Sequence, residues 1–224
     1  MEKLQYLSPM TDSTQNVLFV LASASIVALA FRAVKRSRSP IIETKLCCPC
    51  GKVKGTIRAK YEDSERIYCC STDCRAYNKA IAGLGGKCNK SLNHEYGETH
   101  VCQFCKSAAT IDGGLEHIKL ARKAPNEGAF RYYADCCNAP LMNTADFVAF
   151  VGFYEDILDE NHKKFHGPVV LFENEAEKPF DLPIPKISVP RLLWGLVRYL
   201  PYRDAGPFDY GLEPFYWGDN KKTD

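Results

Sequence analysis

The feature of this sequence that most constrains its fold is a set of eleven cysteines, most of which stand in tight groups. The cysteines are Cys47, Cys48, Cys50, Cys69, Cys70, Cys74, Cys88, Cys102, Cys105, Cys136 and Cys137. A secreted disulfide framework favours an even number of cysteines and a cleavable signal peptide. The number here is odd, and the basic residues follow the N-terminal apolar run instead of preceding it. Zinc ligation is therefore the leading explanation of the grouping.

Pairs of cysteines a few residues apart can place two thiolates on one tetrahedral zinc ion. Three groups fit this pattern: Cys48-Pro49-Cys50-Gly51, Cys69-Cys70-Ser71-Thr72-Asp73-Cys74 and Cys136-Cys137. Gly51 frees the backbone just after a thiolate, where amide hydrogens commonly turn toward sulfur. Successive side chains of a strand point to opposite faces, so Cys136 and Cys137 can share an ion only in a turn. Otherwise one of the two is a core thiol.

The length and composition indicate one ordinary folded domain with appendages. The chain has 224 residues, of which 46% are hydrophobic and 25% charged, and these averages exclude global disorder, collagen and coiled coil. Lys and Arg number 29 against 27 Asp and Glu, which leaves a net charge of +2. This small excess lacks the broad basic footprint of a general nucleic-acid binder, so no nucleic-acid partner is expected.

Residues 17–31 are uncharged and mostly apolar, and a basic cluster from Arg32 to Arg38 follows directly. This arrangement predicts a membrane anchor over residues 17–34, which reaches a spanning length of about 18 residues only if Arg32 snorkels. The basic flank would leave residues 40–224 facing the cytosol, as in a single-pass membrane protein. The alternative is a buried core helix, because the run lies near the length boundary.

The middle of the chain predicts a mainly β fold. Its apolar stretches are short and are separated by Gly, Asn and Asp, as in Val53–Ile57, Arg66–Cys70, Ala129–Tyr133 and Val169–Phe172. Helices are predicted over Arg75–Ala82, with Asp73 in the N-cap region, and over Ala145–Leu158.

The C-terminal part of the chain is rich in proline and aromatic residues. Within it, residues 191–200 place their leucines on one helical face and Arg191 and Arg198 on the other. This short amphipathic helix either docks on the zinc domain or lies on a membrane surface. The predicted domains are a membrane anchor and linker over 1–40, a zinc domain over 41–175 and a C-terminal extension over 176–224.

Three blocks of the sequence resemble those of the glutathione-dependent formaldehyde-activating enzyme and centromere protein V family. Between roughly residues 45 and 145 they read, in the family's order, Cys48-x-Cys50-Gly51-x-Val53-x-Gly55, Cys69-x4-Cys74-Arg75 and Arg131-Tyr132-Tyr133-Ala134-Asp135-Cys136-Cys137-Asn138-Ala139-Pro140-Leu141. Family members typically read Cys-x-Cys-Gly, Cys-His-Cys-x-x-Cys-Arg and Phe-Cys-x-x-Cys-Gly-Ser-Pro-Leu. In the altered second block, Ser71 stands at the middle cysteine and Cys70 one place earlier. In the third block, Cys137 matches the second cysteine and Ala134 the first, as in a divergent branch.

The resemblance implies an Mss4-like fold, a β-tent of small sheets pinned by zinc. It also implies a structural zinc ion held by Cys48, Cys50 and Cys137, with Cys136 as a candidate fourth ligand. The resemblance to the family also implies a second, catalytic zinc ion.

The second block implies a zinc ion with an open coordination position at Cys69 and Cys74, where Cys70 would replace the missing third thiolate. Such an ion can take a substrate thiolate or polarise a carbonyl, so these three cysteines are the predicted catalytic residues. The leading function is then carbon–sulfur lyase-type chemistry on glutathione or another thiol adduct by a membrane-anchored zinc protein. The alternative is a non-catalytic, zinc-stabilised interaction module at a membrane.

Cys102 and Cys105 have the spacing of a further knuckle, with His100 and Cys88 nearby. They are either an additional zinc site in an inserted loop or spare thiols. The remaining histidines have no convincing ligand partner in the sequence and are expected to face solvent; they are His94, His117, His162 and His166.

Overall fold

The computed structural model describes residues 17, 27, 30–31, 34–85, 98–125, 127–145, 148–171 and 212–218. The chain divides into two compact units, Met1–Ser39 and Pro40–Asp224. In the second unit, the described residues form two β-sheets and one α-helix. The prediction of a mainly β fold with few helices is confirmed.

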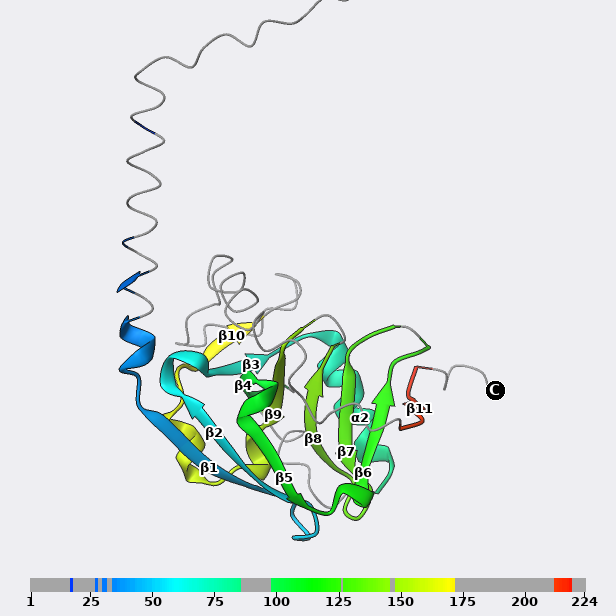
Figure 1. Ribbon diagram of the computed structural model, residues 1–224. Coiled ribbons are helices and arrows are strands. Elements are labelled where there is room, and N and C mark those ends of the chain that lie inside the picture. Colours follow the sequence, from blue (N-terminus) through cyan, green and yellow to red (C-terminus); the bar gives the residue numbers. More distant parts are fainter. Residues whose placement is uncertain are drawn as a thin grey trace, which may run out of the picture. The chain divides into compact units, whose positions relative to one another are not determined.

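The smaller sheet is antiparallel and has three strands, β1 (Ile41–Cys47), β2 (Lys54–Lys60) and β5 (Ala109–Gly113). The larger sheet has eight strands, β3 (Glu65–Cys69), β4 (Thr99–Cys105), β6 (Ile118–Arg122), β7 (Phe130–Ala134), β8 (Ala139–Thr144), β9 (Phe150–Tyr154), β10 (Val169–Leu171) and β11 (Phe215–Tyr216). Their order is β10-β3-β4-β9-β8-β7-β6-β11 (Figure 1). The two edge strands pair in parallel, β10 with β3 and β11 with β6, while the inner pairs are antiparallel.

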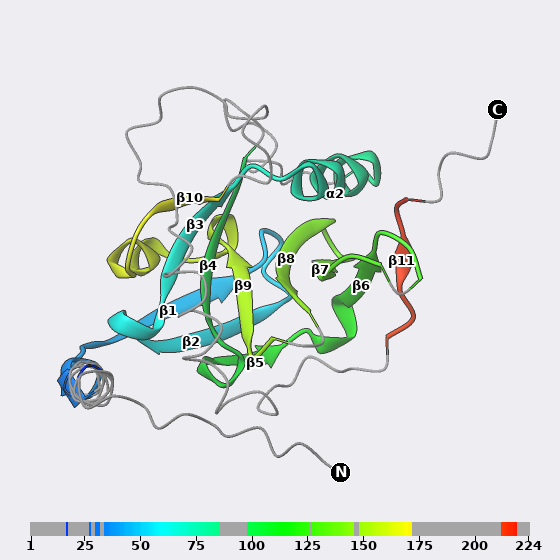
Figure 2. The same ribbon diagram turned by 90° about the horizontal axis from the view of Figure 1, so that it is seen from above.

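Helix α2 (Thr72–Gly83) lies on one side of the large sheet and strands β1 and β2 lie on the other (Figure 2). Leu46 and Ile57 of the small sheet pack with Phe104 and Phe153 of the large sheet in one core. A second core gathers Tyr77 and Ile81 of α2 with residues of the large sheet. Short 3₁₀ helices occupy Tyr61–Asp63, Lys106–Ala108, Leu115–His117, Glu155–Ile157 and Glu160–Lys164.

The position of a strand explains its sequence pattern. In β1, exposed and buried residues alternate strictly, because only one face of the small sheet meets the core. In β8, by contrast, five of six residues are buried, because this strand lies inside the large sheet with a covered face on either side. The four segments predicted as strands from the sequence overlap β2, β3, β7 and β10.

The predicted helix Arg75–Ala82 lies within α2, but the residue that caps it is Ser71 and not Asp73. The predicted helix over Ala145–Leu158 is wrong, because its centre is strand β9 and its end is a 3₁₀ turn. The sequence of β9, Phe-Val-Gly-Phe-Tyr, is rich in aromatic residues, and four of its five residues are buried. Burial on both faces removes the alternation that distinguishes a strand from a helix.

Most of the segment predicted as a membrane anchor, residues 17–34, lies outside the described residues. Within the described part of the chain, no helix has the length and apolarity needed to cross a membrane. This finding overturns the predicted transmembrane helix and the single-pass localisation with residues 40–224 in the cytosol. The physical reason is that residues 17–34 would rise only about 27 Å as a helix, against a hydrocarbon core of about 30 Å, and would place the charge of Arg32 within that length.

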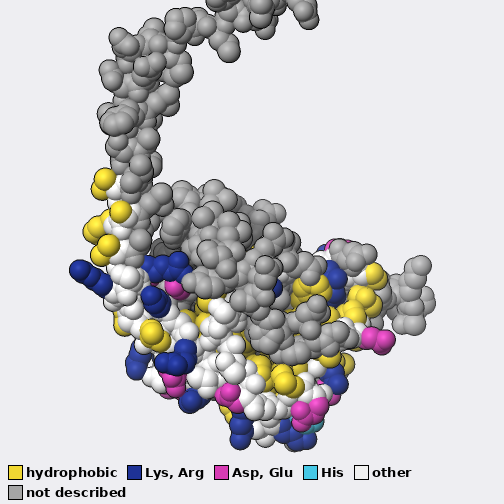
Figure 3. All heavy atoms as spheres, in the orientation of Figure 1, with side chains coloured by type: hydrophobic (Ala, Val, Ile, Leu, Met, Phe, Trp, Pro, Cys, Tyr) yellow, Lys and Arg dark blue, Asp and Glu magenta, His cyan; other side chains and the backbone are white. Residues whose placement is uncertain are grey.

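The predicted amphipathic helix over residues 191–200 lies outside the described residues, as do Cys88 and His94. In the C-terminal extension, the structure describes 212–218, which contain β11. On the face shown in Figure 3, the basic and acidic side chains of the described residues are interspersed.

Candidate functional site

The loop between β1 and β2 carries Cys48 and Cys50 and folds as a knuckle. The Cys48 carbonyl accepts a hydrogen bond from the amide of Gly51 at 2.8 Å, and the Cys48 sulfur accepts one from the amide of Val53 at 3.2 Å. Gly51 has a φ of +80°, which side-chain-bearing residues rarely adopt. Glycine therefore lets the loop close tightly behind the two thiols.

Cys136 and Cys137 lie in the turn that joins β7 to β8. Asn138 ends this turn with a φ of 50°, and its side chain donates a hydrogen bond to the carbonyl of Leu84, at the C-terminal end of α2, at 2.7 Å. The turn satisfies the condition under which these adjacent cysteines can point to one centre.

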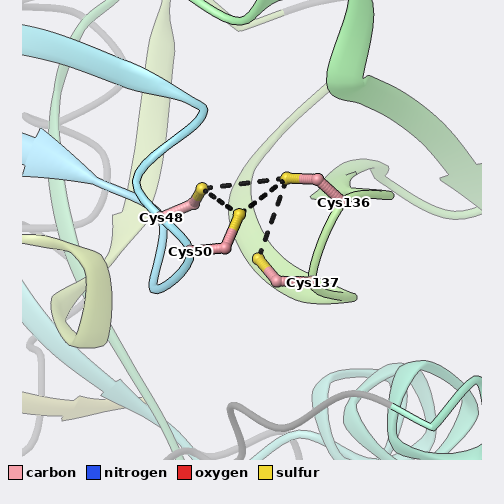
Figure 4. Close-up of side chains that lie close together, drawn as sticks. All are labelled: Cys48, Cys50, Cys136 and Cys137. Atoms are coloured by element: carbon pink, nitrogen blue, oxygen red, sulfur yellow. Dashed lines mark hydrogen bonds between the residues drawn. The ribbon is translucent and has the colours of Figure 1, made fainter.

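The loop and the turn bring four sulfur atoms together (Figure 4). Cys50 Sγ lies 3.5 Å from Cys48 Sγ and 3.1 Å from Cys136 Sγ. Cys136 Sγ lies 3.9 Å from Cys48 Sγ and 4.0 Å from Cys137 Sγ. All four sulfur atoms lie within 4.8 Å of one another, so Cys48, Cys50, Cys136 and Cys137 could hold a metal ion.

The thiols of this cluster differ in their pKa values. A hydrogen bond with Cys136 lowers the pKa of the exposed Cys50 thiol to about 7. Burial raises the pKa of Cys136 and raises that of Cys137 to about 11. A metal ion that binds all four thiolates must therefore displace protons, which makes its affinity rise with pH.

His117 and Asp135 adjoin the cluster through Cys136, and the three side chains form a second group that could hold a metal ion. His117 Nδ1 lies 2.9 Å from Asp135 Oδ1, and Lys119 Nζ lies 3.5 Å from Asp135 Oδ2. The His117 side chain is 26% exposed. The prediction that His117 merely faces solvent is thus incomplete, because the ring also faces a carboxylate beside the cluster.

Cys69 and Cys74 form a second, separate thiol pair. Cys69 ends β3 and Cys74 is the third residue of α2, and their sulfur atoms share a hydrogen bond at 3.2 Å. The hydroxyl oxygen of Ser71 lies 3.4 Å from Cys69 Sγ and accepts a hydrogen bond from the Cys74 amide at 3.2 Å. Ser71 therefore caps the helix and fixes its first turn beside the end of β3.

Arg131 of β7 supplies a positive charge to this pair. Its Nη2 donates to Cys74 Sγ at 3.5 Å, and its guanidinium lies over the rings of Tyr77 and Trp217, 5.2 and 5.8 Å from their centroids. Arg131 is only 5% exposed. Within the described part of the chain, its Nε and Nη1 have no hydrogen-bond partner.

The two thiols of the pair have opposite acidities. The hydrogen bond with Cys69 lowers the pKa of Cys74 to about 5, and the charge of Arg131 lowers it further against the effect of burial. The same hydrogen bond, together with burial, raises the pKa of Cys69 well above its usual range. These two directions favour a thiolate at Cys74 and a protonated thiol at Cys69.

Cys70 does not join Cys69 and Cys74 to make a three-thiol site. A site of that kind would need all three sulfur atoms within 4.8 Å of one another, and these three do not meet that condition. Successive side chains of an extended chain point to opposite sides, and Cys70 directly follows the last residue of β3. Cys70 is buried, and this burial raises the pKa of its thiol to about 11. The sequence-based placement of Cys70 as the third thiolate of this site is therefore not reproduced.

Cys102 and Cys105 do not form a knuckle. Both lie on β4, where residues three apart point to opposite faces. Cys102 is buried with its sulfur 3.7 Å from Glu155 Oε1, whereas Cys105 Sγ lies 3.3 Å from Ser107 Oγ. Of the two alternatives, spare thiols describe these residues better.

The sequence interpretation missed a buried polar network around Glu155. Arg66 Nε donates to Glu155 Oε1 at 2.8 Å, and His162 Nε2 lies 3.6 Å from Glu155 Oε2. Although burial opposes ionisation, contacts with His162 and Arg66 lower the pKa of Glu155 to about 2. His162 is buried, so its predicted solvent exposure is wrong. Arg66, Glu155 and His162 lie far apart in the sequence, so no local pattern predicts that they meet. Arg131 is different, because a charged residue within the aromatic strand sequence Phe-Arg-Tyr-Tyr is visible in the sequence.

No curated protein matches this chain. A crystal structure of a Rhodobacter sphaeroides protein, a structural genomics target, matches 52% of this chain and 88% of its own at 16% identity and a TM-score of 0.34. A likeness at this level carries no argument about fold or function. A family of unknown function matches residues 41–174, which include both thiol clusters. By this match over more than half of its length, the chain belongs to the family DUF6151.

Proposed function

We propose that this chain is a zinc-binding protein in which Cys48, Cys50, Cys136 and Cys137 hold one structural zinc ion. The observation that carries the proposal is the set of four sulfur atoms within 4.8 Å of one another. Four thiolates that leave no place for a substrate are a common donor set of structural zinc. The ion would tie the β1–β2 loop to the β7–β8 turn, as in the zinc-pinned, Mss4-like β-tent that the family resemblance implies.

The test is the metal content of the purified full chain. We expect one tightly held zinc ion for these four ligands, and we expect Cys50→Ser to lose it. Cys47→Ser is the matched control, because Cys47 is also exposed and lies in the same segment but outside the cluster. Equal zinc content in both variants would contradict the proposal.

A second candidate function is carbon–sulfur lyase-type chemistry on glutathione or other thiol adducts. The observation that favours it is the thiolate of Cys74, 3.2 Å from the sulfur of Cys69 and held by Arg131. This chemistry would need a second zinc ion, for which the predicted third thiolate, Cys70, is out of place. A second zinc equivalent, together with turnover of a glutathione–aldehyde adduct that Cys74→Ser abolishes, would support it. With one zinc and no turnover, a non-catalytic zinc-stabilised interaction module is the function that remains.

A further inference from the structure

A structural zinc at the four-cysteine cluster leaves the Cys69–Cys74 pair and Arg131 unexplained. A buried cation is costly unless an anion faces it. No salt bridge to a carboxylate is found for Arg131 within the described residues, and the group that faces its Nη2 is the Cys74 sulfur. The buried guanidinium therefore favours the thiolate form of Cys74.

The position of Cys74 also favours a thiolate. It lies in the first turn of α2, a helix of 12 residues. The N-terminal end of a helix carries partial positive charge, and cysteines at such ends are more acidic and more reactive than ordinary thiols. Helix and arginine thus act on the same sulfur from separate elements.

Cys69 provides a second thiol within reach. The two sulfur atoms lie 3.2 Å apart, and a disulfide bond needs about 2.05 Å, so the pair can close with a small local shift. Ser71 contacts both residues and keeps the end of β3 next to the start of α2.

We propose that Cys69 and Cys74 form a peroxide-reactive dithiol in which Cys74 is the nucleophile and Cys69 the resolving thiol. The thiolate of Cys74 attacks one oxygen of hydrogen peroxide; a sulfur–oxygen bond forms, the oxygen–oxygen bond breaks and hydroxide leaves to be protonated by solvent. The sulfur of Cys69 then attacks the sulfenic acid of Cys74, and the disulfide forms. The hydroxyl group of the sulfenic acid leaves as water with the proton of Cys69. The pair loses two electrons and the peroxide gains them.

Burial restricts the oxidant to small molecules. Cys69 is 8% exposed and Cys74 5% exposed, which admits hydrogen peroxide more readily than a bulky disulfide such as oxidised glutathione. The N–H groups of Arg131 that have no partner within the described residues are available to donate to the peroxide oxygen. These N–H groups would stabilise the negative charge that develops on the leaving hydroxide as the oxygen–oxygen bond breaks.

The test uses the full, zinc-loaded chain, reduced and then treated with a small excess of hydrogen peroxide. We expect peptide mapping without reductant to find a Cys69–Cys74 disulfide that dithiothreitol reverses. In Cys69→Ser the reaction should stop at a sulfenic acid on Cys74 that dimedone traps, and in Cys74→Ser residue 69 should stay reduced. Arg131→Gln should slow the oxidation at least about tenfold, because the thiolate loses its counter-charge. If that variant fails to fold, the cysteine variants decide the matter.

The matched control is Cys70→Ser, which removes the buried thiol adjacent to the pair and should leave the rate unchanged. Oxidation of Cys70 as fast as Cys74 would overturn the proposal, as would reaction with oxidised glutathione faster than with peroxide. A zinc equivalent lost in both Cys69→Ser and Cys74→Ser would also overturn it, since the pair would then be a metal site. None of these outcomes depends on zinc at the four-cysteine cluster, which Cys50→Ser tests separately.

Discussion

The four-cysteine cluster and the Cys69–Cys74 pair both gather thiols, but they balance negative charge in different ways. The cluster gathers four sulfur atoms, and one of its members, Cys50, is exposed. The pair is buried and has Arg131 beside it. The comparison teaches that grouped thiolates need a cation, which the proposed metal ion would supply in one region and the side chain of Arg131 supplies in the other.

The two regions also differ in their span of sequence. Cys48 and Cys136 are 88 residues apart, whereas Cys69 and Cys74 are five apart. Closing a long loop removes more entropy from the unfolded chain than closing a short one. The cluster is therefore suited to stabilise the fold and the pair is suited to local chemistry.

The largest expected effect follows from removing the proposed metal ion from the cluster. By loop-closure arithmetic for a span of this length, the cross-link contributes about 4.6 kcal/mol. For a chain of this size that corresponds to a fall in Tm of about 10 °C or more. Calorimetry with and without a chelator measures it. An unchanged Tm after complete metal removal, verified by elemental analysis, would contradict the structural role of the cluster.

The Ser71→Cys variant would give the second region three sulfur atoms and so make it more like the first. It places a third sulfur where the Ser71 oxygen now lies, 3.4 Å from Cys69 Sγ, and soft thiolates select zinc. We expect the variant to bind one more zinc ion per chain than the wild type. Elemental analysis and the absorbance of the cobalt-substituted protein report it. An unchanged zinc content would mean that Arg131 excludes a cation from this site.

A pH series separates Cys74 from its neighbour Cys70. Because the pKa of Cys74 is lowered to about 5, its thiolate persists as the pH falls and is lost only near that value. Its alkylation by iodoacetamide, followed by peptide mass spectrometry, should be nearly constant from about pH 8 to about pH 6 and decline below that. The pKa of Cys70 is raised to about 11, so its slower alkylation should increase throughout this range. Parallel profiles for the two cysteines would refute the assignment of Cys74 as a thiolate.

The smallest effect is expected for Ser71→Ala. Loss of the N-cap hydrogen bond should lower the free energy of unfolding by about 1 kcal/mol, measured by urea denaturation. Ser71→Thr, which keeps a capping hydroxyl at the same position, is the control and should change it less. Because the cap also orients Cys74, the peroxide reaction should slow as well. A change in stability without a change in reaction rate would show that the cap does not position the thiol.

The sequence predicted the parts of the cluster that depend on local spacing. Cys48-x-Cys50-Gly51 predicted a knuckle, and the adjacent Cys136 and Cys137 were expected to share an ion only in a turn, which is where they lie. What joined the two halves was the resemblance to a family and not the spacing. Their meeting depends on the pairing of distant strands, which no local pattern encodes.

The second region was predicted less well for the same physical reason. Its two thiols lie five residues apart and were recognised, yet their cation comes from β7, 57 residues beyond Cys74. Ser71 was interpreted as a lost ligand, whereas the structure uses it as a helix cap. The predicted helix at β9 failed because burial on both faces hides the period of a strand.

The position of Trp217 beside Arg131 should make its fluorescence sensitive to the charge of the Cys69–Cys74 pair. The chain has two tryptophans, and this one is 8% exposed, with its ring centroid 5.2 Å from that of Tyr77 and 5.8 Å from the guanidinium carbon of Arg131. An indole beside a buried arginine emits according to the local electric field, which changes when the thiolate facing that arginine becomes a neutral disulfide. If Cys74 forms the proposed disulfide, the emission of Trp217 should therefore change with the oxidation state of Cys74, which can be measured without a label by comparison with a Trp194→Phe variant.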